Sequence, residues 1–178
     1  GYRLDELGKG WQVAMTTLLH ERGAGELQTP RSGGMKSKAT HSTNTANLIE
    51  LARVTSRNGK PAADDPLIRD RIMQLVIQEA GLGQNQRRAR VSALQDHPAR
   101  LLLQNKLLAS EIAQAIGATA MEVEGASASL YLGDDNAPAG GQWPMAYMNS
   151  YGMTIAAGTS EVQRNILGER VLGLAKSK

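Results

Sequence analysis

The chain has 178 residues, of which 41% are hydrophobic and none is cysteine. This length and composition suffice for one domain with a hydrophobic core, and they exclude disulfide bonds, a cysteine nucleophile and a cysteine-ligated metal. The formal net charge of +3, from 20 basic and 17 acidic residues, is too small to indicate a nucleic-acid-binding protein.

Four arginines nevertheless gather in the middle of the chain: Arg87, Arg88, Arg90 and Arg100. No aromatic residue lies among them, so a solvated or interfacial face explains them better than a nucleic-acid-binding surface. A free-standing basic helical binding module stays open as an alternative, and binding to nucleic acid at low salt would test it. The absence of a signal pattern and of ~18 consecutive apolar residues favours a cytoplasmic protein without a membrane span.

Phenylalanine is absent, so the core has to be built from Leu, Ile, Val, Met and Ala, which suits helices better than sheets. The sequence starts at Gly1 without Met, and residues 8–10 read Gly-Lys-Gly, a turn signal. We expect a piece of a longer protein, in which residues 1–10 are a linker or the end of a preceding domain and residues 11–178 form a helical bundle domain.

The first helix is predicted from Trp11 to about Arg22, because Trp11, Met15 and Leu18 recur with the helical period. Glu21 projects about 60° from Leu18, on the flank of this apolar stripe, where a carboxylate is half-buried. The following residues 23–43 are rich in Gly, Ser, Thr and Lys, which indicates a loop.

Two further helices are predicted before residue 97. The first covers residues 45–57 and stops at Asn58-Gly59. The second starts at Asp65-Pro66, a capping residue followed by proline at the first helical position, and reaches Gly81. The sequence leaves open whether this helix continues as a polar stretch over residues 84–94.

The longest helix is predicted to begin near His97-Pro98 and carries two apolar stripes on roughly opposite sides. The first comprises Leu101, Leu108, Ile112, Ala115, Ile116 and Val123, and the second Leu103, Leu107 and Met121. A helix that is apolar on two sides sits between neighbours in a bundle, so the expected fold is an all-α up-and-down bundle of four to five helices. Residues 125–141 are loop-like, and residues 143–153 lead to the last motif.

That motif is a flexible turn at residues 156–158 followed by Thr159 and Ser160, whose hydroxyls can cap a helix. Ser160 and Gln163 have the spacing of a capping box. An apolar stripe follows, made of Val162, Ile166, Leu167, Val171 and Leu174. The uncovered N–H groups at such a helix start suit a phosphate, a ribose hydroxyl or a carbonyl oxygen, although an ordinary capped terminal helix would look the same.

The remaining chemistry is limited to carboxylates. His20, His41 and His97 lack metal-ligand spacing, and no serine lies in a nucleophile elbow. A base that removes a proton next to a carbonyl is partly desolvated, and Glu21 beside Leu18 fits that need, although a surface pair with Arg22 is the simpler alternative. Further acid–base candidates are Asp134, Asp135, Glu161 and Glu169.

The chain resembles the C-terminal half of an acyl-CoA dehydrogenase. Residues 157–167 read AGTSEVQRNIL and residues 169–174 read ERVLGL, which is similar to the C-terminal Gly-Thr-Ser-Glu signature of that family. Residues 8–11 (GKGW), residues 19–22 (LHER) and Lys106 support the resemblance.

The resemblance implies a flavoprotein with an N-terminal helical domain, a middle β-domain and a C-terminal helical domain, usually assembled as a tetramer. Such enzymes act in fatty acid metabolism and β-oxidation. They oxidise an acyl-CoA to its trans-2-enoyl form: a Glu removes the α-proton, the β-hydride passes to FAD, and electron-transfer flavoprotein accepts the electrons. We expect this piece alone to be inactive.

The sequence departs from the family pattern at the base. Many members carry the catalytic Glu immediately before Gly-Thr, where this chain has Ala157. In the branch that includes isovaleryl-CoA and long-chain dehydrogenases the Glu precedes an Arg on the first helix of this domain, as Glu21 precedes Arg22 here. The resemblance therefore implies Glu21 as base, the backbone N–H of Ala157 as donor to the thioester carbonyl, and Thr159 and Glu161 as flavin contacts.

Two further family motifs are missing. The Arg-x-x-Phe-Gly stretch is replaced by residues 69–73 (RDRIM), and Gln-x-x-Gly-Gly is not recognisable near residues 124–126 (EGA). These gaps motivate a second hypothesis, in which the chain is a non-catalytic subunit of a hetero-oligomeric dehydrogenase whose partner supplies the base.

Overall fold

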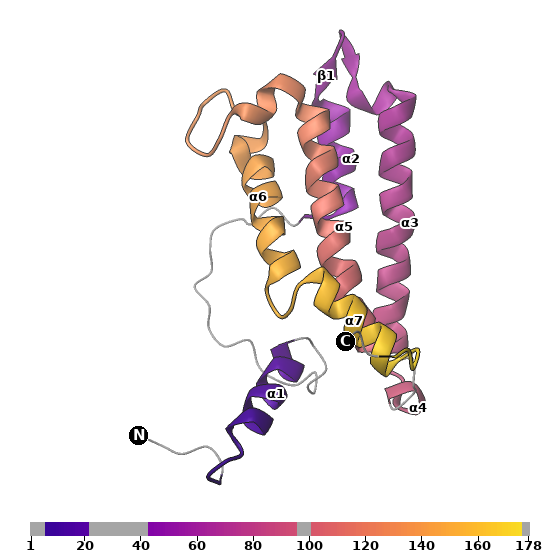
Figure 1. The fold of residues 1–178 in the computed structure, drawn as a ribbon. Coiled ribbons are helices and arrows are strands. Elements are labelled where there is room, and N and C mark those ends of the chain that lie inside the picture. Colours follow the sequence, from indigo (N-terminus) through magenta and orange to yellow (C-terminus); the bar gives the residue numbers. More distant parts are fainter. Residues whose placement is uncertain (1–5, 22–42, 96–100, 176–178) are drawn as a thin grey trace.

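The computed structural model describes residues 6–21, 43–95 and 101–175, and within these ranges four helices run side by side in alternating directions. They are α2 (Thr45–Val54), α3 (Pro66–Arg88), α5 (Leu101–Glu124) and α6 (Gln142–Ile155) (Figure 1). The last helix, α7 (Ser160–Arg170), packs against α5 at the lower end of the bundle. This confirms the predicted all-α up-and-down bundle.

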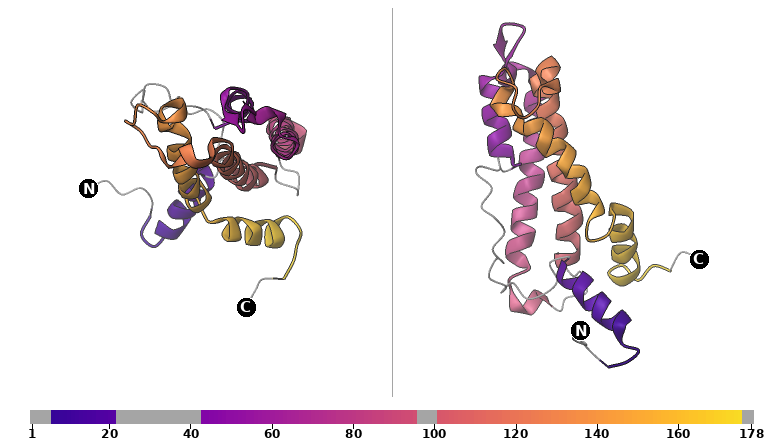
Figure 2. Two further views of the ribbon diagram at one scale, coloured as in Figure 1. Left: turned by 90° about the horizontal axis from the view of Figure 1, so that it is seen from above. Right: turned by 90° about the vertical axis from the view of Figure 1, so that its left-hand side faces the viewer.

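Two further α-helices, α1 and α4, lie outside this arrangement. In Figure 1 and in the right-hand view of Figure 2, α1 (Gly10–Glu21) lies beyond the lower end of the four-helix bundle. The one-turn helix α4 (Ser92–Gln95) follows α3. The predicted loop at residues 23–42 lies outside the described residues.

A two-stranded hairpin replaces the end of the predicted second helix. Helix α2 stops at Val54, and β1 (Ser56–Arg57) pairs antiparallel with β2 (Lys60–Pro61). The turn between them is Asn58-Gly59, whose φ angles of 52° and 76° are both left-handed. Such a turn matches the twist of a hairpin, so the Asn-Gly pair closes two strands, and the prediction of a helix to Arg57 was wrong. The short helix η1 (Ala62–Asp64) leads on to α3.

Helix α3 starts as predicted: Asp65 is the N-cap and accepts from the backbone N–H of Leu67 at 2.9 Å, with proline at the first helical position. The helix then continues through Gly81 and Gly83 to Arg88, so the polar continuation considered for residues 84–94 is part of this helix only as far as Arg88. Contact with α5 along its length outweighs the modest helix propensity of glycine.

The core lies between α5 and the helices around it. Ile116, Ala120 and Val123 on α5 have no exposed surface, and they pack with Leu48 of α2 and Trp143 of α6. The first predicted stripe of the long helix is therefore confirmed as the core face from Leu108 to Val123, whereas the side chain of Leu101 lies outside the described residues. Among the described helices, none combines the length and apolar character that a membrane crossing requires.

The connection from α5 to α6 contains two short 3-10 helices, η2 (Gly125–Ser129) and η3 (Pro138–Gly141). Gly141, at the start of α6, has a φ of 72° and packs against the preceding loop. A Cβ atom placed on it would lie 2.4 Å from the carbonyl carbon of Tyr131 and 2.6 Å from the nitrogen of Leu132. The close approach of two backbone segments therefore requires glycine at this position.

Helix α6 differs from its neighbours because none of its 14 residues is charged. Its inner side is anchored by Trp143, which is 2% exposed. Four large apolar or aromatic side chains of the helix are exposed: Met148, Tyr151, Met153 and Ile155. The described residues leave this outer face of α6 uncovered. It is unusually apolar for an exposed helix surface.

We predict that Gly141→Ala destabilises the fold far more than Gly140→Ala. Both glycines have left-handed φ angles, 72° and 65°, so each alanine costs about 1 kcal/mol of backbone strain. Only at Gly141 does the added methyl group also clash with backbone, which adds roughly 1–3 kcal/mol. Urea unfolding of both variants measures the difference, and equal destabilisation would contradict the packing described for this loop.

Candidate functional site

The turn between α6 and α7 has a left-handed backbone at two successive residues. Ala157 has a φ of 57° and Gly158 a φ of 98°. Glycine adopts such angles freely, whereas alanine does so at a cost of about 1 kcal/mol or more. A strained residue of this kind persists only when its surroundings hold it, and two side chains do so here.

The first is Gln163, whose Nε2 donates to the carbonyl oxygen of Ala157 at 2.8 Å, and the second is Lys106, whose Nζ donates to the carbonyl oxygen of Gly158 at 2.7 Å. Gln163 comes from α7 and has no exposed surface, while Lys106 comes from α5. Donors from two helices therefore hold two successive carbonyl groups of the turn.

The cap of α7 is Thr159, whose hydroxyl oxygen accepts from the backbone N–H of Val162 at 3.3 Å. The predicted capping box of Ser160 and Gln163 was wrong. Ser160 is already the first helical residue and is buried, and the amide of Gln163 points back to the carbonyl of Ala157 instead of to a backbone N–H. The structure thus confirms Thr159 as a capping residue and assigns Gln163 to the turn.

The apolar stripe predicted for α7 is only partly covered. Val162 is 42% exposed and Leu174 is 60% exposed, whereas the buried residues of the helix are Ser160 and Gln163. Leu167 and Val171 do face α5. The predicted apolar stripe is thus buried only in part, because the interior side of the first turn is polar.

Glu161 lies exposed in the first turn of α7, next to Thr159. The pKa of its carboxyl lies below its usual range, chiefly because its own backbone N–H donates to it and also because the Thr159 hydroxyl does. The group therefore stays ionised at neutral pH and already complements the positive end of the helix dipole. A second anion would be repelled here, so this helix start fits the hydroxyl groups of a cofactor better than its phosphates.

The predicted base, Glu21, is described only by its backbone. Glu21 is the last residue of α1, in agreement with the predicted helix, but its side chain lies outside the described residues. The structure therefore brings Ala157, Thr159 and Glu161 together in one turn and helix start. Glu21 as base, and the roles assigned to the other three residues, stay predictions.

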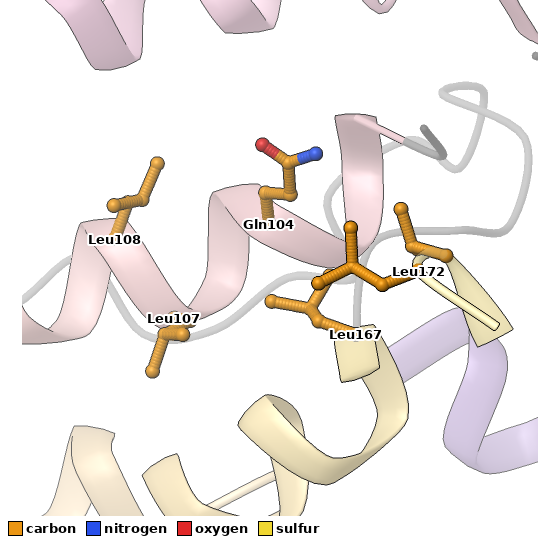
Figure 3. A pocket seen from close by; sticks show the side chains of 6 residues that line it. Gln104, Leu107, Leu108, Leu167 and Leu172 are labelled. Atoms are coloured by element: carbon orange, nitrogen blue, oxygen red, sulfur yellow. The ribbon is translucent and has the colours of Figure 1, made fainter. Parts of the chain in front are cut away.

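An apolar pocket of ≈ 250 Å³ lies between α5 and α7 (Figure 3). Gln104 and two leucines of α5 line one side, and Leu167 with the residues after α7 lines the other. The complete lining is Gln104, Leu107, Leu108, Leu167, Val171 and Leu172. Leu107 and Leu108 belong to the two stripes predicted for the long helix, so the two-sided apolar pattern serves both the core and this pocket.

Glu124, at the end of α5, is a buried carboxyl that the sequence reasoning did not select. It is 5% exposed, and neither carboxyl oxygen has a hydrogen-bond partner among the described residues. Burial raises the pKa of Glu124 to about 7. The signal was present in the sequence, because Ile116, Ala120 and Glu124 recur every four residues on one helix face.

The remaining acid–base candidates, Asp134, Asp135 and Glu169, do not lie at the turn between α6 and α7. Asp134 accepts from the backbone N–H of Asn136 at 2.8 Å in the exposed loop, where Asp135 is exposed as well. Glu169 lies near the opposite end of α7. Over the described ranges, no three His, Asp or Glu side chains are arranged to hold a metal ion.

Comparison with known proteins gives matches over nearly the whole chain. Residues 8–172 match the family described as "Acyl-CoA dehydrogenase, C-terminal domain". The chain is 34% identical over 177 residues to acyl-CoA dehydrogenase IpdE1 of Mycolicibacterium smegmatis, covering 99% of this chain and 40% of that protein. It is likewise 34% identical over 175 residues to the protein of the same name from Mycobacterium tuberculosis, covering 95% and 39%. The chain thus spans about two fifths of the length of these relatives.

Two solved structures have the same fold. The ChsE4-ChsE5 complex from Mycobacterium tuberculosis is similar with a TM-score of 0.64 and 23% identity, over 75% of this chain and 35% of that chain. An FAD-dependent dehydrogenase is similar with a TM-score of 0.60 and 22% identity, over 74% and 33%. At these identities the likeness describes the helical architecture.

We predict that the stability of this domain falls as the pH rises from about 4.5 to 7, and that Glu124→Gln removes that part of the dependence. The folded state keeps the Glu124 proton up to about pH 7, whereas the unfolded state releases it near the ordinary pKa of the group. Folded protein therefore binds more protons in this window, so unfolding becomes easier by up to about 3 kcal/mol and then levels off above pH 7.

Urea unfolding at pH 5 and pH 8 measures this difference, and a comparison between two pH values cancels the constant effect of the new amide. Glu122→Gln is the matched control, since Glu122 is an exposed carboxylate on the same helix that pairs with Arg71. An unchanged pH dependence in Glu124→Gln would show that the buried carboxyl does not titrate as described.

Proposed function

Because the chain belongs to the acyl-CoA dehydrogenase family, as a C-terminal helical domain, we propose that it is part of an FAD-dependent enzyme that oxidises an acyl-CoA thioester to a trans-2-enoyl-CoA. The observation that carries the proposal is the left-handed turn at Ala157 and Gly158, which leads into the Thr159-capped start of α7. A turn of this kind can aim a backbone N–H at a carbonyl oxygen on which negative charge develops.

The roles of the residues follow from their chemistry. Glu21 removes the α-proton of the thioester, and the backbone N–H of Ala157 donates to the thioester carbonyl oxygen, on which negative charge develops. Ala157 itself cannot act as a base because its side chain is a methyl group. The base is therefore sought on α1, which ends at Glu21.

Thr159 and Glu161 are the residues that would hold FAD, which supplies the acceptor for the β-hydride. Their fit rests on the Glu161 carboxylate, whose lowered pKa keeps it ionised so that it would accept from hydroxyl groups of the cofactor, and on the Thr159 hydroxyl beside it. Thr159 is the N-cap of α7, and Glu161 lies in its first turn. The name of one fold neighbour, an FAD-dependent dehydrogenase, agrees with this cofactor.

The proposal extends to the whole protein. We infer that residues 1–10 join this domain to a preceding one, that residues 11–178 form the bundle domain, and that the protein works as a cytoplasmic tetramer. Electron-transfer flavoprotein is the proposed electron acceptor, and β-oxidation of a fatty acyl chain is the proposed context. The 178 residues alone would lack the remainder of the flavin site.

We predict that Glu21→Gln in the flavin-loaded, full-length protein lowers turnover of an acyl-CoA by about 10²–10⁴-fold, the contribution of a positioned general base. FAD content, measured by absorbance, stays unchanged because the side chain acts on the substrate. Glu6→Gln is the matched control, since Glu6 pairs with Lys9 at 3.2 Å on the surface just before the same helix. Retained turnover with bound flavin in Glu21→Gln would overturn the assignment.

A second function is favoured by the alanine at position 157 and by the similarity to a complex of two differently named chains, ChsE4 and ChsE5. In this alternative the chain is the non-catalytic subunit of a hetero-oligomeric acyl-CoA dehydrogenase, and its partner supplies the base. The chain then contributes packing and part of a flavin site.

The two functions predict different behaviour of the full-length protein purified alone. A catalytic subunit binds FAD, is yellow and reduces its flavin when an acyl-CoA is added. A non-catalytic subunit shows no flavin reduction until the partner chain is co-expressed. Flavin reduction by the single purified chain would therefore eliminate the second function.

A further inference from the structure

Gln163 is an unusual residue to find at the interior side of α7. It has no exposed surface, and its Oε1 has no hydrogen-bond partner among the described residues. Burying such an unpaired acceptor costs about 1–3 kcal/mol, which an aliphatic side chain of similar size would avoid. What the amide offers and an aliphatic chain lacks is the Nε2 donor, which is bonded to the carbonyl oxygen of Ala157.

Lys106 makes the corresponding contact one residue further along. Its ammonium group donates to the carbonyl oxygen of Gly158 at 2.7 Å in a partly buried contact. A charge-assisted hydrogen bond of this length is among the stronger interactions that a protein makes. The peptide groups after Ala157 and after Gly158 are thus each fixed by a donor, and the two donors belong to different helices.

Fixing these carbonyl groups also fixes the direction of the Ala157 N–H. The N–H lies on the preceding peptide group, which is connected to the held carbonyl only through the two backbone torsions of Ala157. If φ changed from 57° to the ordinary right-handed value, the preceding peptide would turn by roughly 120° relative to the held one. The left-handed conformation of one residue therefore decides where this N–H points.

We propose that Gln163 and Lys106 are positioning residues that hold the turn left-handed, so that the Ala157 N–H stays aimed at the thioester carbonyl. This inference rests on the proposed function. It assigns a role to two residues whose side chains contact the turn, and it explains how the strained alanine is held: side-chain donors bind the carbonyl groups on its C-terminal side.

The experiment is a double-mutant cycle in the flavin-loaded full-length protein, with Gln163→Leu, Ala157→Gly and the combination of both. We expect Gln163→Leu to lower kcat about tenfold, which is less than the roughly 10²–10³-fold loss expected on complete removal of an oxyanion donor, with a smaller change in KM. The kcat of Ala157→Gly alone is the reference against which the effect of Gln163→Leu in the glycine background is measured. In the double variant, glycine removes the cost of the left-handed angle. Its kcat is therefore expected to be about fivefold higher than that of Gln163→Leu.

Lys106→Met tests the second donor without disturbing the interior of α7, and Ala157→Gly is expected to rescue it in the same way. Arg164→Met is the matched control: Arg164 is the next residue of α7 and pairs with Glu111 of α5 on the exposed surface. Its loss breaks a contact between the same two helices without touching the turn. Full activity in this control separates the turn from general α5–α7 packing.

Hydrogen exchange of the backbone amides at residues 157–159 is the readout that does not require catalysis. Gln163→Leu and Lys106→Met are expected to raise the exchange rates there at least tenfold, and Arg164→Met is not. If exchange rises in both variants but the wild-type protein oxidises no acyl-CoA, the proposed function fails. The role of Gln163 and Lys106 in holding the turn then still stands. Unchanged exchange in both variants, or no rescue by Ala157→Gly, would overturn the positioning role.

Discussion

The packing of α5 against four other helices is the constraint on which the described structure depends. Helices α2, α3 and α6 contact its upper and middle turns, and α7 contacts its lower part. Ile116, Ala120 and Val123, which have no exposed surface, form the centre of that packing. The same helix carries Lys106, so the element that organises the core also fixes the turn before α7. Core and candidate site therefore share one helix.

Much of the bundle was predictable because its helices carry a clear period. The Asp65-Pro66 start and the core face of the longest helix were both legible in the sequence. The end of α2 was not, because Asn58-Gly59 ends a helix and closes a hairpin equally well, and only the pairing of the flanking strands decides between the two. The extension of α3 through its glycines depends on contact with α5, which local propensity does not contain.

In the candidate site, too, local features were predictable from the sequence, whereas long-range side-chain contacts were not. Thr159 was one of two adjacent residues whose hydroxyls were predicted from the local sequence to cap a helix, and it is the N-cap of α7. The spacing of Ser160 and Gln163 suggested a local box, but Gln163 contacts the turn six residues earlier in the chain. Its partner in that task, Lys106, lies 52 residues away from the carbonyl it holds. Side-chain contacts over such separations are properties of the packed helices and have no local pattern.

The uncharged helix α6 has a consequence for how this domain meets other surfaces. Because its 14 residues carry no ionisable acid or base apart from two tyrosines, the exposed face of Met148, Tyr151 and Ile155 keeps the same charge at every physiological pH. Burial of this face is governed by the release of water alone, so salting-out ions strengthen it and ordinary ionic screening does not weaken it. A contact formed there is insensitive to the acidification that titrates Glu124.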